Sequence, residues 1–167
     1  MPNPTGNAVV SELSRAGKYL LFRLGREEYG LGVLKVREIV SHQDPVPVPH
    51  SPAFVKGVIN LRGKVVPVMD LRERLGLPPD SDPRRTSIII VQVKDVSPPV
   101  LVGAIVDEVL EVIDIQASDI EDAPDFGRNL GDECILGVAK VQARVRILLD
   151  VDKTLVLDAL CELPLRK

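Results

Sequence analysis

The chain has 167 residues, of which 45% are hydrophobic, so it can form one domain or two small ones around a sizeable core. A formal net charge of -3 and an aromatic content of only 3% argue against a nucleic-acid partner, because they leave neither a basic surface nor a stacking platform. No apolar run reaches the roughly 20 residues of a membrane-spanning helix, so we expect a soluble protein without direct membrane insertion.

The first 17 residues have no basic start followed by an apolar core, and they predict a flexible N-terminal arm rather than a secretory signal. Alternating apolar runs follow in two hairpin patterns. "KYLLFRL" and "YGLGVLKVREIV" flank the turn-like "GREE", and "GVINLRG" and "KVVPVMD" flank a tight turn in which we assign structural roles to Asn60 and Gly63. "DLRERLGL" then predicts a short helix that begins at an Asp70–Glu73 capping box. We expect residues 18–77 to form a first β-barrel.

The Pro- and Asp-rich stretch 78–86 is the predicted linker. Beyond it, "SIIIVQV", "VLVGAIVDEVLEVIDI", "ILGVAKV" and "RVRILLDV" again have the character of strands, and they predict a second β-barrel over residues 87–157. "DVDKTLVLDALCEL" is the expected counterpart of the first short helix, and residues 158–167 are expected to form a C-terminal helix or tail.

The two halves resemble each other. Gly30 to Val40 aligns with Gly103 to Ile113, and the segment that starts at Gly57 aligns with the one that starts at Gly137, in the same chain order. This pattern favours two copies of one unit, although coincidence in a valine-rich chain stays open. Many short strands with no long amphipathic helix between them predict an all-β fold of small closed barrels packed together.

The chain supplies few groups for catalysis. His42 and His50 both lie in a Pro-rich loop and are expected to be exposed, and no known catalytic or nucleotide-binding motif is present. Cys134 and Cys161 are expected to be free thiols, with a disulfide between them left open. We therefore expect a binding protein rather than an enzyme, with no metal and no cofactor.

The stretch "FVKGVINLRGKVVPVMDLRERLG", with "EEYGLGVLKVREIV" upstream, closely resembles the CheW family of chemotaxis coupling proteins. The resemblance implies two SH3-like five-stranded β-barrels. It also implies a cytoplasmic, non-catalytic adaptor, recruited to membrane-bound chemoreceptor arrays, that couples chemoreceptor tips to the regulatory domain of a CheA-type histidine kinase in ring-forming assemblies. Alternatives are the same adaptor role in a non-flagellar chemosensory pathway, or a double barrel that binds a peptide or small molecule.

The same resemblance implies a receptor-binding groove between the barrels. The positions of this chain that match the receptor-binding residues of the family are Val36, Glu38, Gly57, Arg62, Val109 and Val112. The two-residue period of a strand would place Val36 and Glu38 on one face, an apolar contact beside a charge. Arg62, at the tip of a tight turn, would either bond a partner or bond carbonyls of the other barrel. Gln142 and Ala143 occupy the matching turn of the second copy, so the two barrels are not expected to do the same work.

Overall fold

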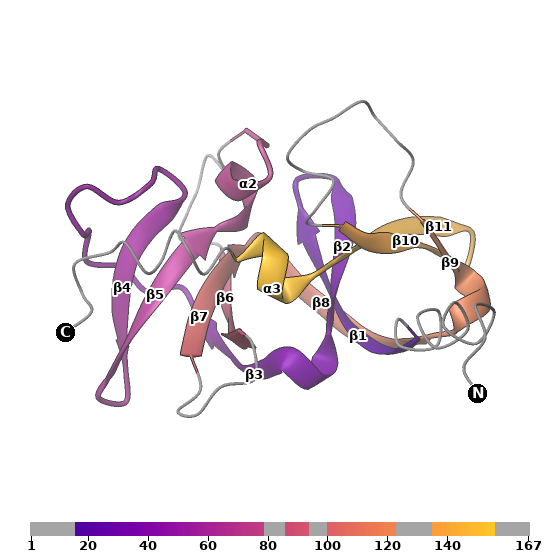
Figure 1. Ribbon diagram of the computed structural model, residues 1–167, viewed down its shortest axis with the longest axis horizontal. Coiled ribbons are helices and arrows are strands. Elements are labelled where there is room, and N and C mark those ends of the chain that lie inside the picture. Colours follow the sequence, from indigo (N-terminus) through magenta and orange to yellow (C-terminus); the bar gives the residue numbers. More distant parts are fainter. Residues whose placement is uncertain (1–15, 79–85, 94–99, 123–134, 156–167) are drawn as a thin grey trace, which may run out of the picture.

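A computed structural model describes residues 16–78, 86–93, 100–122 and 135–155, which form two twisted β-sheets lying side by side (Figure 1). The left-hand sheet has five strands in the order β3-β6-β7-β5-β4. Their bounds are β3 Val36–Ser41, β4 Val55–Leu61, β5 Lys64–Asp70, β6 Ser87–Val93 and β7 Val100–Val106. Neighbours are antiparallel except β5 and β7, which run parallel.

The right-hand sheet has six strands in the order β8-β1-β2-β11-β10-β9. Their bounds are β1 Gly17–Leu24, β2 Glu27–Gly32, β8 Glu108–Ile115, β9 Ile120–Glu121, β10 Ile135–Val141 and β11 Arg144–Leu149. Its one parallel pair joins β2 to β11. The expected all-β architecture is confirmed, with a short sixth strand, β9, added to the second sheet.

Each sheet takes strands from both halves of the sequence, as the mixed colours in Figure 1 show. In the left-hand sheet Val68 of β5 pairs with Gly103 of β7, and in the right-hand sheet Leu148 of β11 pairs with Gly30 of β2. The sequence repeat aligns Val68 with Leu148 and Gly30 with Gly103, so the two halves exchange equivalent hairpins. The division into barrels at 18–77 and 87–157 is therefore wrong, because β6 and β7 complete the first sheet while β1 and β2 complete the second.

Three apolar clusters of described residues hold this arrangement. One belongs to the left-hand sheet alone and includes Ile59, Val68 and Ile90, and a smaller one belongs to the right-hand sheet and includes Tyr19, Ile120 and Leu148. The largest cluster takes side chains from both sheets, among them Phe22 and Ile89, and lies between them. Burying both faces of the inner strands explains why β6 reads as a continuous apolar run rather than an alternating one.

In the part of the chain that the structure describes, each half also supplies one short α-helix. The helix α2, Leu71–Arg74, follows β5, and the Asp70 carboxylate accepts a hydrogen bond from the Arg72 amide at 2.9 Å. The helix α3, Val151–Thr154, follows β11, and Asp150 accepts from the Lys153 amide at 3.2 Å. These matching N-caps follow from the repeat. Most of the predicted arm and linker, both cysteines and the predicted helix or tail 158–167 lie outside the described residues. Within the described ranges, no helix has the length and apolarity to cross a membrane.

Candidate functional site

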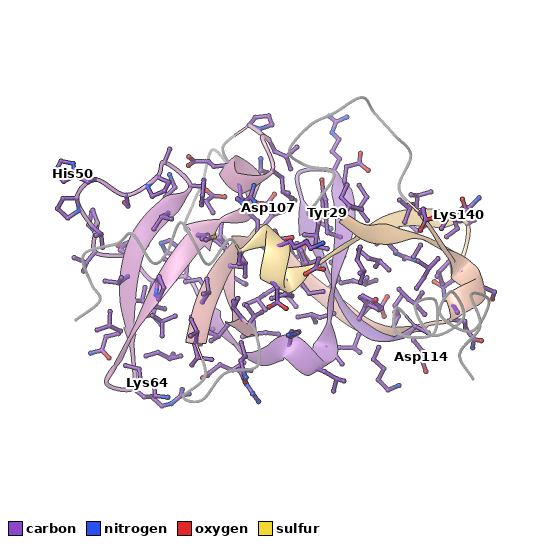
Figure 2. The ribbon with its side chains drawn as sticks, in the orientation of Figure 1. Tyr29, His50, Lys64, Asp107, Asp114 and Lys140 are labelled. Carbon is purple, nitrogen blue, oxygen red and sulfur yellow. The ribbon has the colours of Figure 1, made fainter. Side chains whose placement is uncertain are left out.

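The β4–β5 turn presents Arg62 at the tip of a two-residue loop. Leu61 pairs with Lys64 across it, and the loop residues Arg62 and Gly63 have φ values of 52° and 89°. The Asn60 side-chain oxygen accepts a hydrogen bond from the Gly63 amide at 2.7 Å and fixes the turn. Figure 2 shows the neighbouring Lys64 at the outer end of the left-hand sheet. The backbone therefore holds the base of Arg62 while its side chain stays 71% exposed.

The guanidinium of Arg62 makes a forked ion pair with Glu38 of β3. Nη1 donates to Oε1 at 3.1 Å, and Nη2 donates to Oε2. The hydrogen bond from Arg62 outweighs the cost of desolvation and lowers the pKa of the Glu38 carboxyl, while Glu38 raises the pKa of Arg62. Both groups are therefore charged at neutral pH. In the described structure Arg62 bonds a carboxylate of its own sheet and not carbonyls of the other barrel, which was one of the two contacts considered for it, while a contact with a partner stays a prediction.

A β-bulge at Arg37 separates Val36 from Glu38. Val36 pairs with Val91 and Glu38 pairs with Ile90, so two adjacent residues of β6 face two residues of β3 that are not adjacent. Val36 packs against the core between the sheets, as Val91 does, whereas Ile90 belongs to the cluster of the left-hand sheet. The expectation that Val36 and Glu38 share one strand face is wrong, because the bulge turns the strand between them.

Val109 and Val112 lie on β8 in the other sheet, across a matching irregularity. They pair with Phe22 and Leu20, which both belong to the core between the sheets. Val109 is partly buried against that core, and Val112 is 47% exposed. The repeat aligns Val112 with Ile39 of β3, which is not among the residues predicted from the resemblance and is 44% exposed. We call Val36, Ile39, Val109 and Val112 the seam strip. These apolar side chains belong to the edge strands β3 and β8, and they lie on the faces of the two sheets that pack against the core between the sheets.

Gly57 is buried and has a different role from the other candidates. Its φ is +140°, and a Cβ at this position would lie 2.1 Å from the carbonyl oxygen of Val46. The space is needed because Val46 and Val58 exchange two backbone hydrogen bonds of 2.8 and 3.0 Å. Gly57 therefore seats the Pro-rich loop on β4 and offers no surface to a partner.

His42 also differs from expectation. Its side chain is only 17% exposed, with Nδ1 3.1 Å from the Thr86 hydroxyl and Nε2 2.9 Å from Asp44. It lines a cavity of about 340 Å³ together with Lys56, Arg72 and Asp107, among other residues. Within the described ranges no three metal-ligating side chains come together.

Comparison with known proteins gives consistent results over most of the chain. A family model described as a CheW-like domain matches residues 18–158. The chain is 36% identical over 153 residues to the chemotaxis protein CheW of Klebsiella aerogenes, covering 90% of both chains, and 36% identical over 147 residues to that of Bacillus subtilis, covering 88% of this chain and 92% of the relative. Protein FrzA of Myxococcus xanthus is 28% identical over 133 residues, 80% of each chain. The crystal structure of the scaffolding protein TtCheW from Thermoanaerobacter tengcongensis superposes with a TM-score of 0.75 at 32% identity, covering 86% of this chain and 95% of that one.

Proposed function

We propose, from the premise that the chain belongs to the family of CheW-like domains, that it is a non-catalytic adaptor coupling chemoreceptor tips to the regulatory domain of a CheA-type histidine kinase. In this proposal the protein acts in the cytoplasm and is recruited to membrane-bound receptor arrays. Adaptor and kinase then alternate in rings, since the kinase domain would carry a similar pair of barrels.

The forked pair of Arg62 and Glu38 is the observation on which the receptor-binding part of this proposal depends. A guanidinium held by both its backbone and its counter-ion has lost most of its conformational freedom before a partner arrives, so docking costs less entropy. Its exposed side chain still has donors to offer, and Glu38, whose side chain is 29% exposed, offers an acceptor. A helical receptor tip with polar groups at its surface would meet both.

The seam strip supports the apolar part of the same contact. Ile39 and Val112 are exposed by 44% and 47%, and each belongs to an edge strand rather than to a covered one. Apolar side chains at the border of a core can extend that core onto a partner helix, which is how helix-binding surfaces gain most of their affinity. Gly57 would act in this site only through the loop that it seats.

The experiment mixes the purified protein with a receptor tip fragment and a kinase regulatory domain from the same cell, and measures co-migration in size-exclusion chromatography. Arg62→His should weaken receptor recruitment while kinase binding and folding persist. Gln142→His is the matched control, because Gln142 occupies the equivalent turn position of the second hairpin with a φ of 58°. Equal receptor recruitment by the wild type and Arg62→His would contradict the role of Arg62. If the wild-type protein binds neither the receptor fragment nor the kinase domain, the adaptor function itself is contradicted.

A further inference from the structure

The two short helices contact each other at positions that the sequence repeat makes equivalent. The repeat aligns Arg74, the last residue of α2, with Thr154, the last residue of α3. Arg74 Nε donates to the Thr154 carbonyl oxygen at 2.8 Å, and Arg74 Nη2 donates to the Lys153 carbonyl oxygen at 3.3 Å. The exchange of equivalent hairpins relates the two halves by an approximate two-fold axis, and a contact between equivalent positions lies close to such an axis. Figure 1 shows α3 where the two sheets meet.

The guanidinium of Arg74 is held between groups of both sheets. Carbonyls in the last turn of a helix have no amide partner within that helix, and a guanidinium can donate to two of them at once. On its other side, the ring centroid of Phe54, which precedes β4, lies 5.5 Å from the guanidinium carbon. Arg74 therefore joins the entry to β4 of the left-hand sheet to the helix that follows β11 of the right-hand sheet.

The contact departs from exact symmetry in a way that makes it attractive. Two arginines at equivalent positions near the axis would face each other and repel. The second half has Thr154 at this position, and that residue is buried, with 1% exposure. One half thus supplies the charged donor, and the other supplies backbone acceptors.

Arg72, two residues earlier in α2, makes a second contact with the right-hand sheet. Its Nε donates to Asp107 Oδ1 at 2.8 Å and its Nη2 donates to Oδ2, while the Gly25 amide of the β1–β2 turn donates to Oδ2 at 2.6 Å. Burial alone would raise the pKa of the Asp107 carboxyl, but the hydrogen bonds from Arg72 and Gly25 bring it below its ordinary value, so the carboxylate stays ionised. Figure 2 shows Asp107 near the middle of the molecule. The helix α2 therefore holds the right-hand sheet at two places.

The core between the sheets also holds the helices, but in a different manner. Leu71 of α2, Val151 of α3 and the following Leu155 are all buried in it. Apolar burial depends little on direction, whereas the hydrogen bonds of a guanidinium require defined angles. The core therefore supplies the strength of the contact between the sheets, and the arginines of α2 supply its orientation.

The orientation of the sheets matters for the seam strip, because Val36 and Ile39 lie on one sheet while Val109 and Val112 lie on the other. A helix that contacts both halves of the strip binds more tightly when their spacing is fixed beforehand. We propose that Arg74 is a positioning residue for receptor binding, which fixes the angle between the two sheets and with it the spacing of the two halves of the seam strip. This inference rests on the proposed function, since it takes the receptor tip as the partner of the strip.

The first measurement needs no partner. It uses the full chain with Cys134 and Cys161 replaced by serine and with spin labels on cysteines introduced at the exposed Lys64 and Lys140, which lie at opposite ends of the molecule (Figure 2). Arg74→Met keeps an apolar stem beside Phe54 but removes every donor, so it should broaden the distribution of label-to-label distances. Arg74→Lys restores a charged donor without the fork, and it should return the distribution part of the way to wild type.

The second measurement is the affinity of the unlabelled chain for a receptor tip fragment, by isothermal titration. Arg74→Met should weaken binding by about three- to tenfold, the range expected when a network away from the contact positions it. Arg74→Lys should lie between Arg74→Met and wild type. Should Arg74→Met fail to fold, Arg74→Lys alone should still show a broader distance distribution and weaker binding than wild type.

Two control variants separate orientation from other effects. Arg26→Met makes the same exchange at an exposed residue of the β1–β2 turn, and it should leave both measurements unchanged. Ile59→Val destabilises the core of the left-hand sheet alone, so it should lower the melting temperature without changing the distance distribution or the receptor affinity.

The outcomes distinguish this inference from the proposed function. An Arg74→Met distribution as narrow as wild type would overturn the inference, and so would a broadened distribution with unchanged receptor affinity. A loss of affinity in Ile59→Val as large as in Arg74→Met would reduce Arg74 to a stabilising residue and would overturn it too. If the wild type does not bind the receptor fragment, the proposed function is contradicted together with the receptor role of Arg74, whatever the distances show.

Discussion

Arg62 and Glu38 lie at opposite edges of one five-stranded sheet, and two hydrogen bonds join their side chains. Glu38 is on β3, the first strand in the sheet order, and Arg62 follows β4, the last one. The curled sheet therefore brings its two edges together at this point, and the fork links them. A residue expected to reach outward toward a partner is thus also part of the barrel that presents it.

The link between the two side chains predicts non-additive effects on receptor binding. Glu38→Gln keeps the shape of the side chain but removes the charge that orients Arg62, so it should weaken binding of a receptor tip fragment by a similar factor to Arg62→His. The double variant should bind no more weakly than either single variant, because both changes remove one oriented unit. Isothermal titration of the four proteins completes the cycle.

The melting temperatures of the wild type, the two single variants and the double variant serve as the control for folding in this double-mutant cycle. Since Arg62 is mostly exposed, we expect all four proteins to melt at nearly the same temperature. Strictly additive losses of affinity would mean that Arg62 and Glu38 contact the receptor independently.

The lowered pKa of Glu38 predicts how receptor binding depends on pH. A carboxyl whose folded-state pKa is depressed keeps its charge as the pH falls past its ordinary value, and it loses the ion pair only below its own folded pKa. Wild-type binding should therefore show no Glu38-dependent change between about pH 8 and pH 5. Below that window it should fall toward the level of Glu38→Gln. The ratio of wild-type to Glu38→Gln affinity isolates this group from all others, and a ratio that already declines near pH 6 would contradict the ionised pair.

The two equivalent hairpin turns predict opposite effects of glycine. Ala143 has a φ of 63° where the first hairpin has Gly63 at 89°. An alanine in this left-handed region is strained, so Ala143→Gly should stabilise the protein by about 0.5–1 kcal/mol, and Gly63→Ala should destabilise it by about 1 kcal/mol. Urea denaturation followed by circular dichroism measures both. A destabilising Ala143→Gly would mean that the extra freedom of the unfolded chain outweighs the relieved strain.

Local sequence patterns were sufficient to predict the hairpins. They were not sufficient to predict which strands pair with each other in the two sheets. The turn at Asn60–Gly63 and the N-caps at Asp70 and Asp150 follow from residues within four positions of each other. The parallel pairing of β5 with β7 joins strands that are separated in the chain by α2, the linker and β6, and nothing in either strand distinguishes it from pairing within its own half. The repeat makes both arrangements equally regular, so only the packed structure reveals the exchange.

The candidate site shows the same limit at the scale of single residues. The resemblance selected Glu38 and Arg62, which the fold brings together, and Val109 and Val112, which it places on the other sheet. Strand periodicity failed at Val36 because one inserted residue in β3 reverses the face of everything after it. Neither pattern drew attention to Asp107, whose partners come from α2 and from the β1–β2 turn.

Gly57 provides a final test, since it separates seating of the loop from direct contact with a receptor. In Gly57→Ala the new Cβ would lie 2.1 Å from the Val46 carbonyl oxygen and 2.6 Å from its carbon, both of them backbone atoms that no rotamer can move. The loop must leave β4, or the strand must shift, and we expect a loss of at least about 2 kcal/mol in the free energy of unfolding.

Gly32→Ala is the matched control for this substitution, because nothing lies within 4 Å of its Cβ position and its φ is -57°. It should change the free energy of unfolding by less than about 0.5 kcal/mol. Amide exchange then locates the effect of Gly57→Ala: the Val46 and Val58 amides, which bond each other's carbonyls, should lose protection first. If both amides stay protected while receptor binding is lost, Gly57 acts at the receptor contact and its assignment as a seat for the loop is wrong.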